Sequence, residues 1–137
     1  FEELLVDNTA MQMVMNPGRF DIIVTENLYG DILSDLGAGL VGGLGLMPGV
    51  NKGKDIAIYE SIHGSAPDIA GKNLANPIAM ILTLCLLLDD IGEREKAEKI
   101  RKAISKTLAD KKNYTRDLGG ENTTTGITDA IISNLGI

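Results

Sequence analysis

Two aspartates, Asp31 and Asp35, are four residues apart in a segment whose apolar residues recur at helical spacing. Residues four apart lie on one face of a helix, so these carboxylates are neighbours and repel each other by roughly 0.2–0.5 kcal/mol unless a cation lies between them. Oxygen ligands of this kind suit a hard divalent cation such as Mg²⁺ or Mn²⁺, which completes its coordination with water and substrate oxygens. Two acids near the start of a helix also complement the helix dipole, so the residue types leave both interpretations open.

A loop with ligand-binding groups is predicted over residues 63–77, between a strand and a helix. His63, Asp68 and Asn76 supply a ring, a carboxylate and an amide, and the Gly and Ser residues leave backbone N–H groups accessible. Such a set can bind a flat polar ligand, for example an adenosine moiety. By composition it is equally an ordinary surface loop, and a single histidine is more often structural than functional.

The spacing Gly37-x-Gly39-x-x-Gly42 matches the dinucleotide-binding fingerprint as a string of letters. That fingerprint binds a pyrophosphate only where the first glycine follows a strand and the last one opens a helix. Here the preceding residues are predicted to be helical and the following ones to form a loop. We therefore expect no Rossmann site, and interpret the glycines as allowing close helix packing or ending the helix.

The composition describes an acidic chain of 137 residues, with 13 Lys and Arg against 19 Asp and Glu and a formal net charge of −6. Because no Lys/Arg cluster is longer than a dipeptide, we expect neither nucleic acid nor an anionic membrane as a partner. The longest apolar run, Ile78–Leu88, is too short to span a bilayer and is predicted to be a buried helix. The single cysteine, Cys85, lies in this run and is expected to be a buried, unreactive thiol.

Strand and helix signals alternate along the chain, which indicates an α/β fold with a partly parallel sheet. Asp7 and Asn8 are good N-cap residues, Pro77 suits the first position of a helix, and residues 45–54 are rich enough in glycine to be a loop. Three strands make a thin sheet, so we expect more of the sheet to lie outside this chain. Strands are predicted over 1–6, 20–25 and 56–60, and helices over 9–16, 28–41, 78–90, 93–109 and 127–135, the last with hydroxyl caps from Thr123–Thr125.

Three segments are informative when they are taken together. The most specific is Asn27-Leu-Tyr-Gly-Asp31-Ile-Leu-Ser-Asp35, with the glycine-rich stretch that follows it. The others are Asp7-Asn8-x-x-Met11-Gln12 and the loop from His63 to Pro77. In this order and spacing they resemble the C-terminal part of the β-decarboxylating dehydrogenases, the family of isocitrate, homoisocitrate, 3-isopropylmalate and tartrate dehydrogenases. The resemblance covers essentially the whole chain.

The resemblance implies an isocitrate/isopropylmalate dehydrogenase-like α/β fold, not a Rossmann fold, with this chain as its C-terminal portion. Residues 1–41 would end a small, metal-binding domain and residues 42–137 a large, NAD-binding domain. A homodimer or higher oligomer with a shared active site is implied as well. The family's substrate-binding arginines, catalytic tyrosine and catalytic lysine correspond to positions before Phe1, so we expect no such catalytic residue in this chain and no turnover by it alone.

The resemblance also assigns ligands to particular residues. Asp31 and Asp35 would bind Mg²⁺ or Mn²⁺ together with the substrate's hydroxyl and carboxylate groups, while Asp7 would reach the same metal from the neighbouring subunit. A carboxylate at Asp68 would accept hydrogen bonds from the ribose hydroxyls and repel a 2′-phosphate, which favours NAD over NADP. The residues implied for NAD binding are Glu60, His63, Gly64, Ser65, Ala66, Asp68, Ile69 and Asn76.

The implied activity is the oxidative decarboxylation of isocitrate, a small 2-hydroxy tricarboxylate, to 2-oxoglutarate with NAD and Mg²⁺ or Mn²⁺. Residues 37–45 and 59–63 resemble the isocitrate and homoisocitrate branches, and the intact Asp31 and Asp35 resemble a catalytic subunit. The alternatives are homoisocitrate or 3-isopropylmalate dehydrogenase, or a non-catalytic nucleotide- or metal-binding module. The expected compartment is the cytoplasm, or the mitochondrial matrix in a eukaryote, because a lone cysteine suits a reducing interior.

Overall fold

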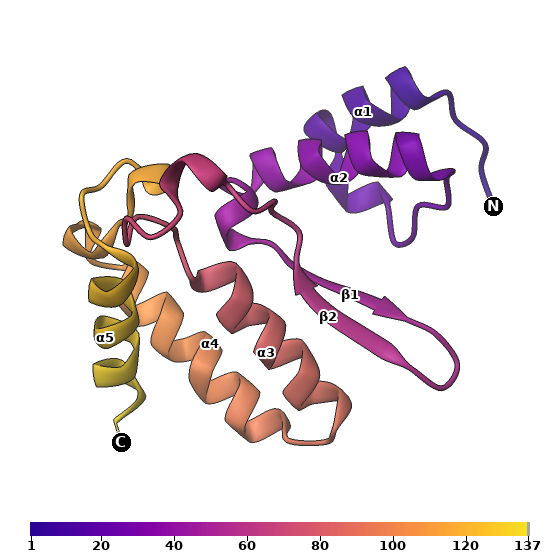
Figure 1. Ribbon diagram of the computed structural model, residues 1–137. Coiled ribbons are helices and arrows are strands. Elements are labelled where there is room, and N and C mark those ends of the chain that lie inside the picture. Colours follow the sequence, from indigo (N-terminus) through magenta and orange to yellow (C-terminus); the bar gives the residue numbers. More distant parts are fainter. Residues whose placement is uncertain (137) are drawn as a thin grey trace. The chain divides into compact units, whose positions relative to one another are not determined.

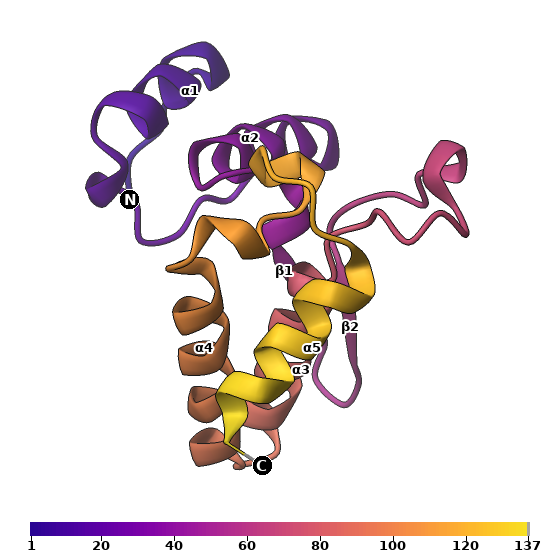
Figure 2. The ribbon, with the colours of Figure 1, turned by 90° about the vertical axis from the view of Figure 1, so that its left-hand side faces the viewer.

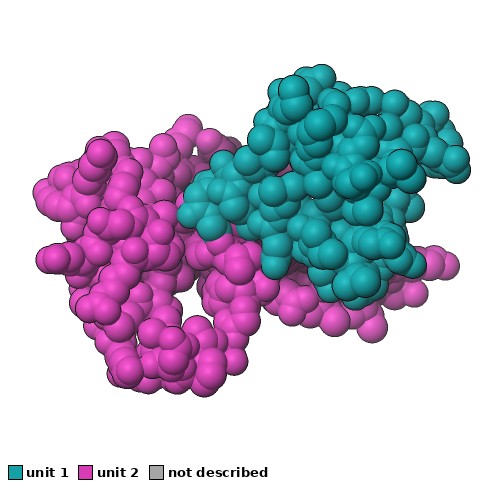
Figure 3. All heavy atoms as spheres, turned by 90° about the horizontal axis from the view of Figure 1, so that it is seen from above, with its two compact units in different colours: residues 1–43 teal, residues 44–137 magenta. Residues whose placement is uncertain are grey.

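The computed structural model describes residues 1–136 and separates into two units, Phe1–Gly43 and Leu44–Ile137 (Figure 3). Each unit has its own helices and its own buried side chains. The division lies close to the boundary predicted between residues 41 and 42, and the assignment of the two parts to a small and a large domain stays a prediction. Within residues 1–136, no helix combines the length and apolar character that crossing a membrane requires.

The first unit is a pair of helices joined by an irregular segment (Figure 1). Helix α1, Val6–Met15, ends before Pro17, which opens a short 3-10 turn over Pro17–Arg19. Helix α2, Asn27–Leu40, packs against α1 and has Leu33 and Ala38 buried. Many of the other apolar side chains in this unit are exposed, so its core is small.

The strands predicted over residues 1–6 and 20–25 are not found in the part of the chain that the structure describes. A strand needs a neighbour that takes its backbone hydrogen bonds, and neither segment pairs with a strand in residues 1–136. Their side chains instead line a hollow of about 750 Å³, where Ile22 and Val24 are largely exposed. The prediction is wrong here because it rests on residue types, whereas a ladder depends on a partner.

The second unit is built around helix α3, Ile78–Asp90, which packs against helix α4, Arg94–Leu108, and against a β-hairpin (Figure 1). Helix α5, Thr124–Leu135, packs along α4 (Figure 2). These helices closely match their predicted ranges, and the hydroxyl of Thr123 caps α5 by accepting a hydrogen bond from the Gly126 N–H at 3.1 Å. The buried residues where they meet are Ile78, Ala103, Ile104, Ile127 and Ile131.

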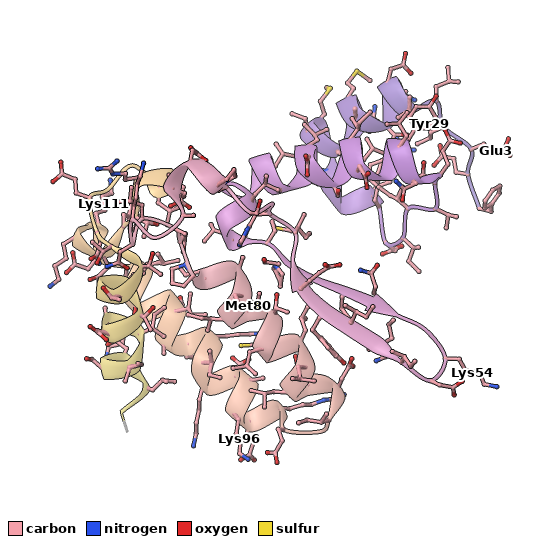
Figure 4. All side chains as sticks on the ribbon, in the orientation of Figure 1. Glu3, Tyr29, Lys54, Met80, Lys96 and Lys111 are labelled. Carbon is pink, nitrogen blue, oxygen red and sulfur yellow. The ribbon has the colours of Figure 1, made fainter. Side chains whose placement is uncertain are left out.

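The hairpin pairs strand β1, Pro48–Lys52, with strand β2, Ala57–Ser61, in antiparallel register, so that Val50 lies opposite Tyr59. In Figure 4, Lys54 projects from its tip. Two expectations are therefore wrong: residues 45–54 are not all loop, and the sheet formed by the described residues is antiparallel rather than partly parallel. The sequence of β1 has low strand propensity, and the strand forms because β2 satisfies its backbone.

Four short 3-10 turns lie in the connections of the second unit, at Leu44–Leu46, Pro67–Ile69, Lys111–Asn113 and Arg116–Leu118. Two smaller expectations are confirmed. Cys85 is fully buried in α3, and this burial raises the pKa of its thiol. Gly37 and Gly39 lie inside α2 and no strand precedes them in residues 1–136, so the arrangement that a Rossmann fingerprint requires is not present there.

The hairpin is fastened to the end of α3 by three polar side chains. Asp90 accepts a hydrogen bond from Lys52 Nζ at 2.7 Å and from the Tyr59 hydroxyl at 2.5 Å. The Lys52 ammonium first, and the Tyr59 hydroxyl next, hold the pKa of Asp90 below its ordinary value. The hydrogen bond to Asp90 in turn raises the pKa of Tyr59. These contacts fix the strand that leads into the loop after residue 61.

We expect Ile127→Ala to destabilise the protein by about 2–5 kcal/mol, because it removes a fully buried side chain and leaves a cavity. Ile132→Ala is the matched control on the same helix, since half of that side chain is exposed and its loss should cost much less. The free energy of unfolding measured in urea checks both variants. Equal losses would show that the core is not where we place it.

Asp90→Asn should lower the melting temperature at neutral pH and have no effect in strong acid. The lowered pKa of Asp90 means that its contribution to stability is present above the ordinary aspartate pKa of about 3.9 and is lost as the pH falls through the folded-state value. Melting temperatures of both proteins from pH 2 to 8 at low salt test this. A difference that stays constant with pH would contradict the proposed ion pair.

Candidate functional site

The two aspartates of the acidic pair lie one turn apart on α2, and both are exposed. Among the described residues, neither takes part in an ion pair. In residues 1–136 the one side-chain hydrogen bond to these two carboxylates comes from Asn27, whose Nδ2 donates to Asp31 Oδ2 at 3.2 Å. Two adjacent carboxylates without a cationic neighbour have the charge and the hard oxygen donors that Mg²⁺ or Mn²⁺ needs. Asp31 and Asp35 thus fit a divalent metal.

Asp7 lies in the first turn of α1 rather than at its N-cap. The helix begins at Val6, Leu5 occupies the cap position, and Asp7 Oδ1 accepts a hydrogen bond from the Asn8 N–H at 2.7 Å. The expectation that Asp7 caps the helix is wrong, because the helix begins at Val6, two residues earlier than a cap at Asp7 would place it. An acid in a first turn still interacts favourably with the helix dipole.

The structure does not assemble the three proposed metal ligands into one site. Residues 1–136 contain no group of three or more His, Cys, Asp or Glu side chains placed to hold a metal ion. Asp31 and Asp35 therefore stand as a pair in this chain, with Asp7 on the other helix of the same unit. The role of Asp7 as a ligand to a neighbouring subunit's metal stays a prediction.

The loop after β2 folds around a hollow of about 290 Å³, near the lower end of the volumes of small-molecule sites. Figure 2 shows this loop standing out from the helices of the second unit. Five of the predicted residues line the hollow, whereas Glu60, Asp68 and Asn76 do not. The lining residues are His63, Gly64, Ser65, Ala66, Ile69, Ala70, Gly71, Asn73, Leu74, Ala75 and Thr124.

His63 is oriented by its own loop. Its Nδ1 lies 3.0 Å from the Gly64 carbonyl oxygen, which can only accept, so Nδ1 carries the proton and donates. In the neutral ring, Nε2 is then an acceptor that can meet an N–H group of a ligand. The loop backbone supports a close turn here, because Ala66 has a left-handed φ of 42° and opens the 3-10 turn that carries Asp68.

Asp68 is exposed in that turn, and no ion pair engages it in residues 1–136. Its carboxylate can therefore accept hydrogen bonds from ligand hydroxyl groups. Ile69, the next residue, reaches into the hollow. The exposed carboxylate of Asp68 and the apolar side chain of Ile69 suit the sugar and the base of a nucleoside better than a metal ion.

Asn76 differs from the rest of the loop because its amide is already satisfied by the protein. The residue is 7% exposed; Nδ2 donates to Asp117 Oδ2 at 2.9 Å, and Oδ1 accepts from the Ile78 N–H at 3.0 Å. Asp117 also accepts from the Thr115 hydroxyl at 2.5 Å. The Asn76 side chain thus fixes the end of the loop to the start of α3, and its predicted cofactor contact stays a prediction.

Glu60 is exposed on β2, between the half-buried Tyr59 and Ser61. Asn51 Nδ2 donates to Glu60 Oε1 at 2.7 Å, and Gly49 lies opposite Glu60 in the register, where it has no side chain to crowd the carboxylate. The Thr83 hydroxyl donates to the Glu60 carbonyl oxygen at 3.0 Å. One carboxylate oxygen is therefore held in place while the other can accept from a ligand.

Sequence reasoning missed Asn73 and Thr124 as residues of the hollow. The hydroxyls of Thr123–Thr125 are interpreted from the sequence only as caps for a helix, and nothing in the spacing shows that this helix begins beside a loop about fifty residues earlier in the chain. Asn73 has a left-handed φ of 58°, which asparagine tolerates well, but this is a property of the folded backbone that the sequence does not show.

The sequence and the fold both match known proteins. A family model described as isocitrate/isopropylmalate dehydrogenase matches residues 1–131. The isocitrate/homoisocitrate dehydrogenase of Thermus thermophilus is 54% identical over 134 residues, which are 98% of this chain and 40% of that protein. Catalytic subunit 5 of the mitochondrial NAD isocitrate dehydrogenase of Arabidopsis thaliana is 54% identical over 136 residues, 98% of this chain and 36% of that protein.

Among solved structures, isocitrate dehydrogenase from Methylococcus capsulatus superimposes with a TM-score of 0.90 and 48% identity, over 96% of this chain and 40% of that one. This chain therefore spans about 40% or less of the length of these relatives. The likeness covers both units, so it includes the acidic pair on α2 as well as the loop after β2.

We expect Asp35→Asn to weaken Mn²⁺ binding at least tenfold, because it removes one of two adjacent negative charges from the proposed site. Asp129→Asn, an exposed aspartate on α5, is the control and should leave Mn²⁺ binding unchanged. Titration followed by the Mn²⁺ electron paramagnetic resonance signal measures both. If Asp35→Asn binds Mn²⁺ as tightly as the unchanged protein does, the metal assignment fails.

Proposed function

The chain belongs to the isocitrate/isopropylmalate dehydrogenase family, and we propose that it is the metal- and dinucleotide-binding part of an NAD-dependent β-decarboxylating dehydrogenase. The observation that carries the proposal is the loop after β2, where the exposed Asp68 directly precedes Ile69, which lines the same hollow as His63. The uncompensated pair Asp31 and Asp35 supports it, because the reaction class needs a divalent cation near its substrate's oxygens.

The proposed reaction oxidises isocitrate at its hydroxyl-bearing carbon and then releases CO₂ to give 2-oxoglutarate. When bound, NAD⁺ would supply the hydride acceptor, and Mg²⁺ or Mn²⁺ would supply Lewis acidity at the substrate oxygens. Asp31 and Asp35 would hold the metal and so orient the hydroxyl and carboxylate of the substrate. The substrate-binding arginines and the catalytic tyrosine and lysine are expected elsewhere in the full-length protein.

The loop residues would bind the adenosine end of the dinucleotide. Asp68 would accept hydrogen bonds from the two ribose hydroxyls, and Ile69 would pack in the hollow beside it. His63 and Asn76 are proposed to lie on the adenine side, while Gly64, Ser65 and Ala66 form the loop backbone. Glu60, one of whose oxygens is held by Asn51, is proposed to face the nicotinamide ribose region.

The substrate is proposed to be isocitrate, with homoisocitrate or 3-isopropylmalate as alternatives. The Thermus relative carries both isocitrate and homoisocitrate in its name, and the family model includes isopropylmalate dehydrogenases. The groups that distinguish these substrates bind the side chain attached to the common 2-hydroxy acid, and we expect them outside this chain. Substrate choice therefore depends on residues other than the ones described here.

We also propose a homodimer or higher oligomer with a shared active site. The first unit leaves apolar side chains on both helices exposed, among them Met11, Val14 and Met15 on α1 and Leu28 and Ile32 on α2. Such side chains are suited to cover one another across a subunit interface. The compartment is proposed to be the cytoplasm, or the mitochondrial matrix in a eukaryote, as the mitochondrial name of the Arabidopsis relative suggests.

In the full-length protein, Asp68→Lys combined with Ile69→Tyr should shift coenzyme preference from NAD toward NADP by at least tenfold in the ratio of kcat/KM values. The new cation would attract the 2′-phosphate that Asp68 repels, and each tenfold corresponds to about 1.4 kcal/mol. Steady-state kinetics with isocitrate and Mn²⁺ measure the ratio. Lys72→Ala, an exposed change in the same loop, is the control.

An unaltered ratio in the double variant would refute the coenzyme assignment. A full-length protein that binds NADH but oxidises none of the three candidate substrates would instead favour the non-catalytic binding module.

A further inference from the structure

Asn73 joins the loop around the hollow to the first turn of α5. Its backbone carbonyl accepts a hydrogen bond from the Thr124 N–H at 3.0 Å. Its side chain makes two more: Nδ2 donates to Thr125 Oγ1 at 2.8 Å, and Oδ1 accepts from the Thr125 N–H at 3.1 Å. The Thr124 hydroxyl donates to the Ala75 carbonyl at 2.5 Å. Four hydrogen bonds thus connect two segments that are about fifty residues apart in the sequence.

These hydrogen bonds satisfy polar groups of both the loop and the first turn of α5. The first N–H groups of a helix have no partner inside it, and those of Thr124 and Thr125 find theirs in the loop. The loop in turn is exposed at residues 70–73 and 75, and in residues 1–136 these four hydrogen bonds and those of Asn76 at its end are what join it to the helices. Asn73 also adopts a left-handed φ of 58°, so the backbone turns at the point where the side chain reaches α5.

The connection lies at the hollow itself, since Asn73, Ala75 and Thr124 all line it. Residues 63–66 and Ile69 also line it, and no hydrogen bond joins them to the helices among the described residues. If the contacts at Asn73 break, the wall of the hollow is free to move relative to α5. Ligand binding then has to order the loop, which lowers the observed affinity.

We propose that Asn73 and Thr125 are positioning residues that hold the loop after β2, residues 63–77, in the conformation that binds the adenosine end of the dinucleotide. This inference rests on the proposed function. It adds two residues that set the affinity for the coenzyme although they do not contact the reacting atoms. Loss of the side-chain contacts should weaken binding of the adenosine end, leave the nicotinamide end unaffected and change kcat little.

Two substitutions remove these side-chain contacts in the full-length protein, although Thr125→Val also removes a contact of 3.3 Å between Thr125 Oγ1 and Thr123 Oγ1. Asn73→Gly removes the side chain, and because glycine adopts a left-handed φ readily, the substitution introduces no backbone strain. Thr125→Val removes the hydroxyl at nearly constant volume, and Thr125→Ser restores it. Thr128→Val is the matched control one turn further along α5, where the hydroxyl donates only to the Thr124 carbonyl of the same helix at 2.7 Å.

The readouts are the Kd of NADH from its fluorescence, the inhibition constants of AMP and nicotinamide mononucleotide, kcat and the melting temperature. We expect Asn73→Gly and Thr125→Val to weaken NADH and AMP by about five- to tenfold, the scale of one or two lost hydrogen bonds. Nicotinamide mononucleotide inhibition and kcat should stay within about twofold by the same measure. Thr125→Ser should recover most of the affinity, and Thr128→Val should bind AMP normally.

Three results would overturn the inference. Unchanged AMP binding in both variants shows that the contacts do not position the loop. Equal weakening of AMP and nicotinamide mononucleotide, together with a fall in melting temperature and kcat, shows a general structural role. If the full-length protein without substitutions binds neither NADH nor AMP, the proposed function is wrong and the inference fails with it.

Discussion

The packing of the first residues of α3 into the core of the second unit is the interaction on which the rest of that unit depends. Ile78 is fully buried there among Ile104, Ile127 and Ile131, which come from α4 and α5. Because Asn76 is bonded to the Ile78 N–H, the loop leaves this core in a fixed place. Because Ile127 follows the first turn of α5, the helix start that meets Asn73 is fixed by the same core. This apolar core therefore fixes both the end of the loop at Asn76 and the helix start that meets Asn73.

The two units differ in how many of their apolar side chains are buried. The second unit has a cluster of five buried apolar side chains where its helices meet, and its hairpin is held to α3 by Asp90. The first unit buries only Thr9, Leu33 and Ala38 and exposes much of its apolar surface. Its carboxylate pair stands on a helix that contributes little core of its own, so the rigidity of a metal site there would depend on what covers the exposed helix faces.

Helices and motifs could be predicted from the sequence, whereas pairings could not. The apolar run of α3, the charged face of α4 and the hydroxyl cap of α5 are local signals, and each predicted an observed helix. The strands at residues 1–6 and 20–25 failed because extended apolar backbone forms a ladder only beside a partner. Strand β1 was missed for the converse reason: Pro48-Gly-Val-Asn-Lys52 has little strand character, and β2 supplies what it lacks. In the site, Asp68 and His63 could be found by residue type, but the contact of Asn73 with α5 depends on tertiary structure.

The single cysteine, Cys85, can report how often the core of the second unit opens. Cys85 is completely enclosed in the middle of α3, and its thiol ionises less readily than an exposed one. A thiol reagent can reach it only when α3 separates from its neighbours, so the rate of labelling counts openings of the core rather than motion of the surface. The hairpin, the loop after β2 and α5 all depend on this helix. The labelling rate of Cys85 can therefore distinguish a ligand that stabilises the whole second unit from one that stabilises only the loop after β2.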